Sequence, residues 1–314
     1  MDFLRRLFGQ EAEPEQQDEK TQTDTPRNGG TADTAPLDPA QSEIRFIEDF
    51  RRHIKYGSAQ SVGVERDHNE DALFVLIGNA SGHEALPDFG LFVVADGMGG
   101  HRSGELASSI SVQTVAHRLS QETVMRLLGP TGPTDVPPLH ELLIEALEEA
   151  NRSVVEAVPG GGTTLTVAFL LGDQMTIGHV GDSRAYIINQ DQTEVITRDH
   201  SLVERLKELG QLTADEAATH PQRNVLYRAI GQGENLEVDV FTQPVPKNGY
   251  LLLCSDGLWG EVEDAEIRRI VLEHDDPQNA CEELVRAANA AGGPDNITAV
   301  LVYFPGTGRN VFRG

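Results

Sequence analysis

FVVADGMGG (residues 92–100) and LLLCSDGLWG (residues 251–260) share one pattern, in which a run of apolar residues ends in an Asp-Gly pair. Each apolar run predicts a buried strand. Each pair, Asp96-Gly97 and Asp256-Gly257, would place a carboxylate in a turn at the end of its strand. An Asp-Gly pair is also ordinary turn chemistry, so either copy alone indicates no more than a turn.

Other acidic residues lie next to apolar runs in a similar way. They are Glu70 and Asp71 before residues 72–77, Asp182 within GHVGDSRAY (178–186), and Asp295 before residues 297–304. Carboxylates gathered at strand ends repel one another unless a positive charge lies among them. Oxygen ligands suit Mg²⁺ or Mn²⁺, and the scarcity of neighbouring His and Cys argues against zinc. The pattern therefore predicts a carboxylate-bound metal centre with more than one ion.

Hydrophobic periodicity predicts a mixed fold. The expected strands are 61–65, 73–78, 91–95, 164–171, 175–180, 185–189, 250–254 and 297–304. The expected helices are 104–119, 139–158, 202–209, 265–273 and 277–291, with a surface loop at 129–138. Several strands follow one another through short turns such as 172–174, which favours antiparallel pairing over alternating βαβ units.

The composition predicts one large domain with a tail. The chain has 314 residues, of which 39% are hydrophobic, and no apolar run approaches the roughly 18 residues that span a bilayer. No secretory signal is evident, and Cys254 and Cys281 fit a reducing cytosol better than a disulfide framework. The net charge of −25 argues against a nucleic-acid partner.

Six short motifs follow one another along the chain. They are R-x-x-N-E-D (66–71), D-G-M-G-G-H (96–101), G-G-T-T-L (161–165), G-D-S-R (181–184), D-G-L-W (256–259) and P-D-N-I-T (294–298). In this order they resemble the metal-dependent protein phosphatase family, type 2C, from about residue 57 to residue 304. TRDHSL (197–202) and HPQRNVLYRAIG (220–231) are similar to its bacterial branch, which opposes serine/threonine kinases.

The resemblance implies a fold and an activity. The expected fold is α+β, a four-layer α/β/β/α sandwich of two mainly antiparallel β-sheets flanked by helix pairs. The expected activity is the hydrolysis of phosphoserine and phosphothreonine in proteins by a hydroxide that bridges two divalent metals, Mn²⁺ or Mg²⁺. The alternative is a non-catalytic phosphoprotein-binding adaptor. Pseudoenzymes usually lose a metal carboxylate, and Asp96, Asp256 and Asp295 are all present, so the catalytic interpretation is favoured.

The resemblance also assigns roles at the metal centre. Asp96 bridges two ions, and the backbone carbonyl of Gly97 joins one of them. Asp256 and Asp295 complete the shell of the other ion. Arg66, Asp96 and Asp256 are the implied catalytic residues.

The remaining implied site residues act around these ions. They are Glu70 and Asp71, which hold metal-bound waters, Asp182, which contributes to a third and weaker metal site, and Arg66, which grips two phosphate oxygens. Two positions depart from the pattern of some relatives. Met98 replaces a His proposed to protonate the leaving group, and Gly260 replaces an acid that serves the third metal.

Four segments are expected along the chain. They are a short amphipathic segment (1–10), a disordered acidic linker (11–43), the phosphatase domain (44–307) and a C-terminal tail (308–314). Phe3, Leu4, Leu7 and Phe8 share one helical face, which fits a weak contact with a membrane surface or a protein groove. An unstructured start is the alternative, because so short a helix is marginal in water. We expect a monomeric cytoplasmic enzyme, peripheral to the membrane if this contact forms.

Three features near the predicted site are expected to have supporting roles outside the metal centre. Residues 197–231 are expected to form a mobile flap that gates substrate access. His179 and His200 are expected to make structural hydrogen bonds beside the sheet. Trp259 is expected to pack beneath the Asp256 turn.

Overall fold

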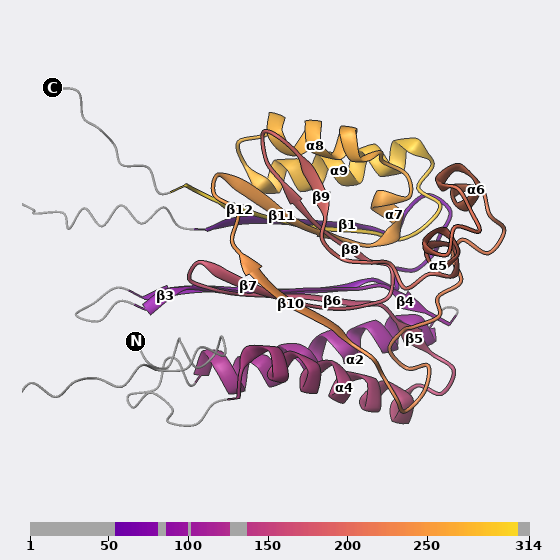
Figure 1. Ribbon diagram of the computed structural model, residues 1–314, viewed down its shortest axis with the longest axis horizontal. Helices are drawn as coiled ribbons and strands as arrows, with labels where there is room; N and C mark the ends of the chain where they lie inside the picture. Colours follow the sequence, from indigo (N-terminus) through magenta and orange to yellow (C-terminus); the bar gives the residue numbers. More distant parts are fainter. Residues whose placement is uncertain (1–53, 81–85, 100–101, 126–136, 307–314) are drawn as a thin grey trace, which may run out of the picture.

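Two five-stranded sheets lie face to face at the centre of the molecule (Figure 1). The computed structural model describes residues 54–80, 86–99, 102–125 and 137–306. The first sheet has the order β1 (Lys55–Ser61), β12 (Ile297–Phe304), β11 (Gly249–Cys254), β8 (Arg184–Ile188) and β9 (Thr193–Val195). The second has the order β10 (Asp239–Pro244), β7 (Gln174–Val180), β6 (Leu165–Leu171), β3 (Leu86–Ala95) and β2 (Ala72–Ala80). Every pairing in the two sheets is antiparallel.

Helix pairs cover the outer face of each sheet (Figure 1). The second sheet is covered by α2 (Arg102–Leu119), which continues into a π-helical turn (Ser120–Val124), and by α4 (Leu139–Ala157). The first sheet is covered by α8 (Asp264–Glu273) and α9 (Pro277–Ala291). The short helices α5 (Leu202–Glu208), α6 (Ala214–Ala218) and α7 (Asp256–Trp259) lie at one edge, with the small ribbon of β4 (Gly97–Met98) and β5 (Gly162–Thr163). This arrangement confirms the predicted α/β/β/α sandwich.

Burial on both faces explains why the strands appear as continuous apolar runs. In β12, Val300 and Val302 enter the core between the sheets, whereas Ala299 and Leu301 pack under α8 and α9. A strand covered on both faces needs apolar residues at successive positions, so its sequence loses the alternation of a half-exposed strand. The same runs that predicted buried strands therefore also reflect the four layers.

The predicted strand at residues 61–65 is wrong. Strand β1 ends at Ser61, and Gly63 then takes a φ of 86°, in the left-handed region that favours glycine. The backbone N–H groups of Val64 and Glu65 bond to the carbonyl of Gly293, away from the sheet. Residues 55–61 contain few apolar side chains because β1 is an edge strand, so the apolar pattern did not reveal it.

Several short elements were also missed. Strands β9 and β10 lie at sheet edges, and α6 and α7 are shorter than the helices that periodicity can detect. The turn predicted at Asp256 proves to be the first residue of α7.

Several predictions lie outside the described residues. They concern the segments 1–10, 11–43 and 308–314, and most of the loop 129–138. Within the part of the chain that the structure describes, no helix is both long and apolar enough to span a membrane.

Candidate metal centre

The strand register brings two of the predicted carboxylates together. Ala72 at the start of β2 pairs with Ala95 at the end of β3. Asp71 and Asp96, the chain neighbours of this pair, therefore lie next to each other at one end of the strands of the second sheet. β4, β5 and α7 lie at the same end of the sandwich in Figure 1.

The first sheet contributes a second pair of carboxylates to this edge. Cys254 of β11 pairs with Ala299 of β12, so the residues that follow β11 and those that precede β12 meet in adjoining turns. Asp256 opens α7 in one turn, and Asp295 lies in the other. Burial, followed by the negative charge of Asp295, raises the pKa of Asp256 above its ordinary value.

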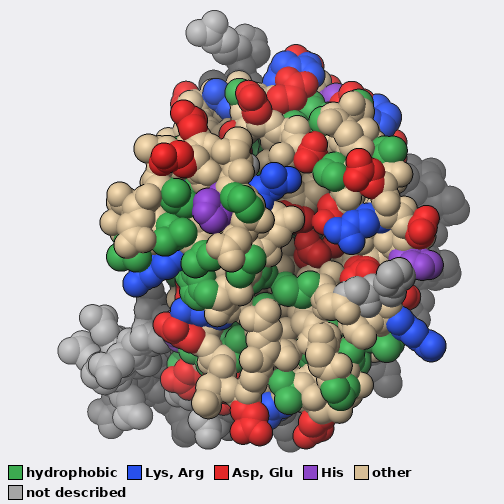
Figure 2. Space-filling view, turned by 90° about the vertical axis from the view of Figure 1, so that its right-hand side faces the viewer, with side chains coloured by type: hydrophobic (Ala, Val, Ile, Leu, Met, Phe, Trp, Pro, Cys, Tyr) green, Lys and Arg blue, Asp and Glu red, His purple; other side chains and the backbone are tan. Residues whose placement is uncertain are grey.

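These turns enclose a cavity of about 460 Å³. All the predicted site residues except Asp71 line it, namely Arg66, Glu70, Asp96, Gly97, Asp182, Asp256 and Asp295. Figure 2 shows the hollow on this face, with red acidic side chains inside it and a blue basic side chain beside them. Arg66 is the single Lys or Arg among the lining residues that the structure describes, so the cavity carries an excess of negative charge.

Asp71 lies buried next to this cavity and is 8% exposed. Its Oδ2 accepts hydrogen bonds from Ser255 Oγ (2.7 Å) and Thr298 Oγ1 (2.6 Å). Burial raises the pKa of Asp71 to about 7, although both hydroxyls oppose that shift. Its other oxygen, Oδ1, is buried without a hydrogen-bond partner among the described residues. That oxygen is therefore available to accept from a water or to face a cation.

Asp96 is tied to two other segments through Thr164. Thr164 Oγ1 accepts from the Asp96 backbone N–H (2.9 Å), and the Thr164 N–H donates to the Asp96 carbonyl (2.9 Å). The same hydroxyl lies 2.7 Å from Ser183 Oγ, in the turn that carries Asp182. Burial, followed by the charges of Asp71 and Asp256, raises the pKa of Asp96 well above its ordinary value.

Asp182 lies in the turn between β7 and β8. Trp259 Nε1 donates to the Asp182 carbonyl (3.0 Å), and Arg184 stacks on the Trp259 ring with its guanidinium carbon 3.6 Å from the centroid. Arg184 also binds Asp199 through both Nε and Nη2. Burial, followed by the charge of Asp256, raises the pKa of Asp182 well above its ordinary value. Trp259, the last residue of α7, thus holds the Asp182 turn and also packs against the hydrophobic core beneath α8 and α9.

Arg66 lies at the mouth of the cavity, with its side chain 49% exposed. Its Nη2 donates to Asp295 Oδ2 (2.7 Å), and its Nε donates to the carbonyl of Pro294 (3.3 Å). Arg66, the single Lys or Arg in the described part of the cavity wall, is thus paired with a predicted metal ligand. A planar guanidinium has five N–H donors, so this pairing leaves donors for a second anion.

Asn296 is a site residue that the motif analysis did not single out. Its Oδ1 accepts from the Glu70 backbone N–H (2.8 Å), and its Nδ2 donates to the carbonyls of Val62 and His68 (2.8 Å each). One buried amide therefore holds the loop that carries Arg66 and Glu70 against the start of β12. The only available signal was its place beside Asp295 in P-D-N-I-T.

Close backbone contacts place Glu70 against the start of α2. A Cβ on Gly104 would lie 1.9 Å from Glu70 Oε2, and a Cβ on Gly97 would lie 2.3 Å from the Gly104 carbonyl. Both positions therefore require glycine. The arrangement puts the Glu70 carboxylate next to the first turn of a helix, where the helix dipole favours negative charge.

A second cavity of about 590 Å³ adjoins the first. The two share Arg66, Asp182, Asn224, Asp256 and Asp295 as lining residues. The expected flap segment contributes residues of α5 and α6 to its wall.

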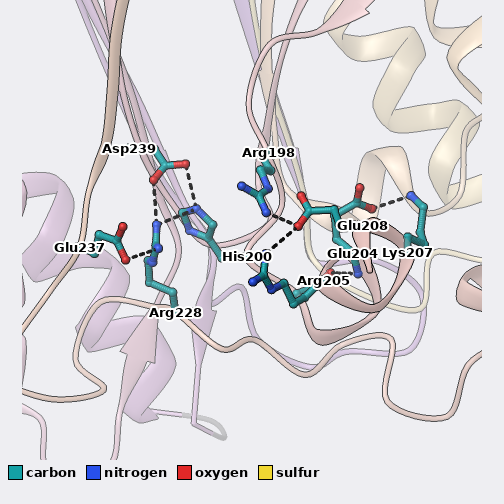
Figure 3. Close-up of polar contacts among 10 residues, drawn as sticks. Arg198, His200, Glu204, Arg205, Lys207, Glu208, Arg228, Glu237 and Asp239 are labelled. Atoms are coloured by element: carbon teal, nitrogen blue, oxygen red, sulfur yellow. Dashed lines mark hydrogen bonds and ion pairs between the residues drawn. The ribbon is translucent and has the colours of Figure 1, made fainter. Parts of the chain in front are cut away.

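Ion pairs connect α5 to the chain before it. Arg198 and Arg205 both donate to Glu208, and Lys207 Nζ lies 2.5 Å from Glu204 Oε2 (Figure 3). The flap thus has charge pairs of its own beside the acidic cavity.

The donor set fits hard divalent cations. Among the described residues, no three His, Cys, Asp or Glu side chains form a ready-made metal cage. Mg²⁺ and Mn²⁺ need fewer protein ligands than such a cage, because waters and backbone carbonyls complete their octahedral shells. Asp71 Oδ1 and Asp256 Oδ1 are both buried without a hydrogen-bond partner in the described part of the chain. Unsatisfied buried carboxylate oxygens around one cavity are the arrangement that a divalent cation would complete.

An acidic cavity at the ends of the strands of a four-layer sandwich has the oxygen donors of a divalent-metal site. Comparison with known families identifies the class of protein, since the family described as Protein phosphatase 2C matches residues 65–301. The chain belongs to this protein phosphatase family, and the fold and enzyme class predicted from the motifs are confirmed.

Relatives with named functions match most of the chain. A "Serine/threonine phosphatase stp" of Listeria innocua is 34% identical over 243 residues, which are 76% of this chain and 90% of the relative. The "Protein phosphatase PhpP" of Streptococcus pneumoniae is 36% identical over 246 residues, covering 77% and 94%. The solved catalytic domain of PstP "in complex with 2 Manganese ions" is 28% identical with a TM-score of 0.64, covering 80% of this chain and 97% of that one.

Proposed function

We propose that this phosphatase hydrolyses phosphoserine and phosphothreonine in proteins with the help of two divalent cations, Mn²⁺ or Mg²⁺. The observation that carries the proposal is the acidic cavity, where carboxylates from five places at the ends of strands meet, namely Glu70, Asp96, Asp182, Asp256 and Asp295. Asp256 Oδ1 in its wall and Asp71 Oδ1 next to it are buried without a hydrogen-bond partner among the described residues. The names of the relatives and the two manganese ions of the PstP catalytic domain support it.

The residues that would hold the cations are those that the family resemblance assigns, and their places around the cavity support that assignment. Asp96 would contact both ions, the carbonyl of Gly97 would join one of them, and Asp256 and Asp295 would hold the other. When bound, such cations lower the pKa of a coordinated water and neutralise charge on the phosphoryl oxygens.

Three further carboxylates would support the ions less directly. Asp71 and Glu70 would accept hydrogen bonds from coordinated waters, since Asp71 has a free acceptor and Glu70 lines the cavity. Asp182 would serve a third, weaker site, because it faces the same cavity from the β7–β8 turn.

Arg66 would orient the phosphate. Its guanidinium would divide its donors between Asp295 and two phosphate oxygens, which a planar fork of N–H groups allows. Met98 also lines the cavity but has no proton to donate. The proton for the departing serine or threonine oxygen would therefore come from a water or from another residue.

The second cavity offers room for the peptide that flanks the phosphorylated residue. It opens directly beside the metal centre and is walled by α5 and α6 of the flap. We propose that the flap gates substrate access. If removing residues 210–222 left both peptide selectivity and turnover unchanged, this role would be wrong.

The decisive experiment measures hydrolysis of a phosphothreonine peptide with and without Mn²⁺. Asp256→Asn should abolish metal-dependent turnover, because it removes a proposed metal ligand. Asp275→Asn makes the same chemical change in the exposed connection between α8 and α9, so it should behave as the wild type. If a folded wild type that binds Mn²⁺ shows no turnover, the phosphoprotein-binding adaptor becomes the better interpretation.

The cellular setting belongs to the same proposal. Phosphate on serine or threonine is added by protein kinases, so the enzyme would oppose a serine/threonine kinase. Cys254 and Cys281 are buried and unpaired, which fits the reducing cytoplasm. We propose a monomer there, with a weak membrane or protein contact through residues 1–10. Co-sedimentation with liposomes, with and without residues 1–10, tests that contact.

A further inference from the structure

A buried histidine lies directly behind the turn that carries Asp182. His200 lies between β9 and α5 and is 1% exposed. Its ring Nδ1 is 3.0 Å from the Gly181 backbone N, and its own backbone N–H donates to the Gly181 carbonyl (2.7 Å). Both backbone polar groups of Gly181 are therefore bonded to a single residue.

The contact with Gly181 defines which ring nitrogen of His200 carries the proton. A backbone N–H can only donate, so Nδ1 must be an unprotonated acceptor and the neutral ring carries its proton on Nε2. Nε2 lies 3.2 Å from Asp239 Oδ2 and donates to it. Burial, followed by the positive charge of Arg228, lowers the pKa of His200, which keeps the ring neutral.

Arg228 and Asp239 hold the far side of the ring (Figure 3). Arg228 Nη1 donates to Asp239 Oδ1 (2.8 Å), and Nη2 lies 2.5 Å from Glu237 Oε2. Arg228 Nη1 and His200 Nε2 are 3.1 Å apart because both donors converge on the same carboxylate. These bonds outweigh the effect of burial and hold the pKa of Asp239 below its ordinary value. The acceptor for the Nε2 proton is therefore a stable carboxylate.

The turn itself has little freedom to adopt another shape. Gly181 has a φ of 111°, and a Cβ there would lie 2.6 Å from the side chain of Thr164. At the next residue, Trp259 donates to the Asp182 carbonyl. His200 and Trp259 thus hold two successive residues of the turn, one from the base of the flap and one from α7.

We propose that His200 is a positioning residue that holds the Gly181–Asp182 turn so that the Asp182 carboxylate faces the metal cavity. Asp239 and Arg228 keep the proton on Nε2 and thereby keep Nδ1 as the acceptor. The inference rests on the proposed role of Asp182 as a ligand of the weakest metal site. In this proposal, the edge strand β10 and the base of the flap also help to hold that metal site in place.

Two substitutions test the two hydrogen bonds of the His200 ring separately, the one at Nδ1 and the one at Nε2. His200→Asn keeps an amide oxygen near the place of Nδ1, so it can accept from Gly181 but is too short to reach Asp239. His200→Gln extends toward Asp239 but does not present an acceptor at the Nδ1 position. Mn²⁺ binding to the full-length protein is then measured by electron paramagnetic resonance, with Asp182→Asn as the reference.

The expected result is an asymmetry between the two variants. His200→Gln should weaken the weakest class of Mn²⁺ sites by about tenfold or more, as Asp182→Asn should, because loss of an outer support typically costs that much. His200→Asn should stay within about threefold of the wild type, even if both variants lose similar stability in urea. Leu142→Ala, a buried change on α4, controls for stability loss alone and should leave Mn²⁺ binding unchanged.

Each contrary outcome has a different meaning. If Asp182→Asn binds Mn²⁺ as the wild type does, the proposed metal role of Asp182 is wrong and the inference falls with it. If Asp182→Asn weakens binding but His200→Gln does not, the role of His200 alone is overturned. If His200→Asn and His200→Gln weaken binding equally, the histidine is structural and does not act through Gly181.

Discussion

Asn296 connects three backbone groups of the metal centre through one side-chain amide, so single-residue changes there should be informative. Asn296→Ala leaves the N–H of Glu70 and the carbonyls of Val62 and His68 without this partner. We expect a loss of about 1–3 kcal/mol in unfolding free energy. We also expect turnover of a phosphothreonine peptide to fall by about tenfold or more, because the loop with Arg66 and Glu70 loosens.

Asn289→Ala is the matched control for this change. Asn289 also makes hydrogen bonds through its amide, to Ser61 and Val285, but it lies at the end of α9 away from the cavity. Urea denaturation and peptide kinetics of both variants check the prediction. Equal turnover in the two proteins would contradict a supporting role for Asn296.

The buried imidazole of His179 should make the free energy of unfolding depend on pH. Burial, followed by the neighbouring His200 ring, lowers its pKa to about 3, against about 6.5 for an unfolded histidine. Below pH 6.5 the unfolded chain binds a proton that the native state does not, so stability falls as the pH decreases. Between pH 7 and pH 5 this effect amounts to about 2 kcal/mol.

A variant without this imidazole measures the effect. His179→Gln should be less stable than the wild type at pH 7, and the difference should narrow by about 2 kcal/mol at pH 5. All other titrating groups are shared by the two proteins and cancel in the comparison. Urea denaturation at both pH values gives the difference, and a constant difference would show that His179 protonates in the native state.

At the scale of elements, the contact between β1 and α9 depends on one glycine. A Cβ on Gly57 would lie 2.3 Å from the backbone of Pro277 and Gln278, at the start of α9. Backbone cannot move aside as a side chain can, so Gly57→Ala should cost about 1–3 kcal/mol or more of unfolding free energy. Ser58→Ala adds no atoms at the next position of the strand and should change stability far less.

The expected effect of Gly57→Ala is local to the first sheet. The helix start that it displaces lies away from the residues that line the metal cavity, so kcat per folded molecule should stay close to that of the wild type. Urea denaturation and peptide kinetics test both parts. A stable Gly57→Ala protein would show that β1 and α9 can separate without cost.

At the scale of the whole molecule, the acidic centre should make stability depend on metal. The pKa values of Asp71, Asp96, Asp182 and Asp256 are all raised by burial. A raised native pKa stabilises the fold at low pH, and that stability is lost as the pH rises from about 4 through the native value. The metal-free protein therefore carries its largest repulsion near neutral and alkaline pH.

Mn²⁺ should relieve this repulsion by binding the ionised carboxylates. We expect the rise in Tm on adding Mn²⁺ to be larger at pH 8 than at pH 5.5, since protons compete with the metal at the lower pH. Differential scanning calorimetry with Mn²⁺ or with a chelator checks this at both pH values. Asp256→Asn should reduce the rise in Tm that Mn²⁺ causes. An equal rise in Tm at both pH values would argue against metal binding by these carboxylates.

Much of the fold could be predicted from local patterns. Long apolar runs such as those of β3, β11 and β12 identified their strands, because burial on both faces requires successive apolar residues. The edge strand β1 and the short elements β9, β10, α6 and α7 could not be identified, because they bury few side chains of their own.

The sequence by itself indicated which carboxylates form the candidate site, because each acidic residue stands next to an apolar run whose strand begins or ends there. Only the tertiary structure decided how they are held. Asp71 is bonded to Thr298, 227 positions away, and Asn296 holds the Glu70 backbone from 226 positions away. Such bonds depend on the register of distant strands and on how the two sheets stack. The local sequence contains no information about strand register or sheet stacking. The roles of Asn296, Thr298 and His200 could therefore be recognised only in the folded chain.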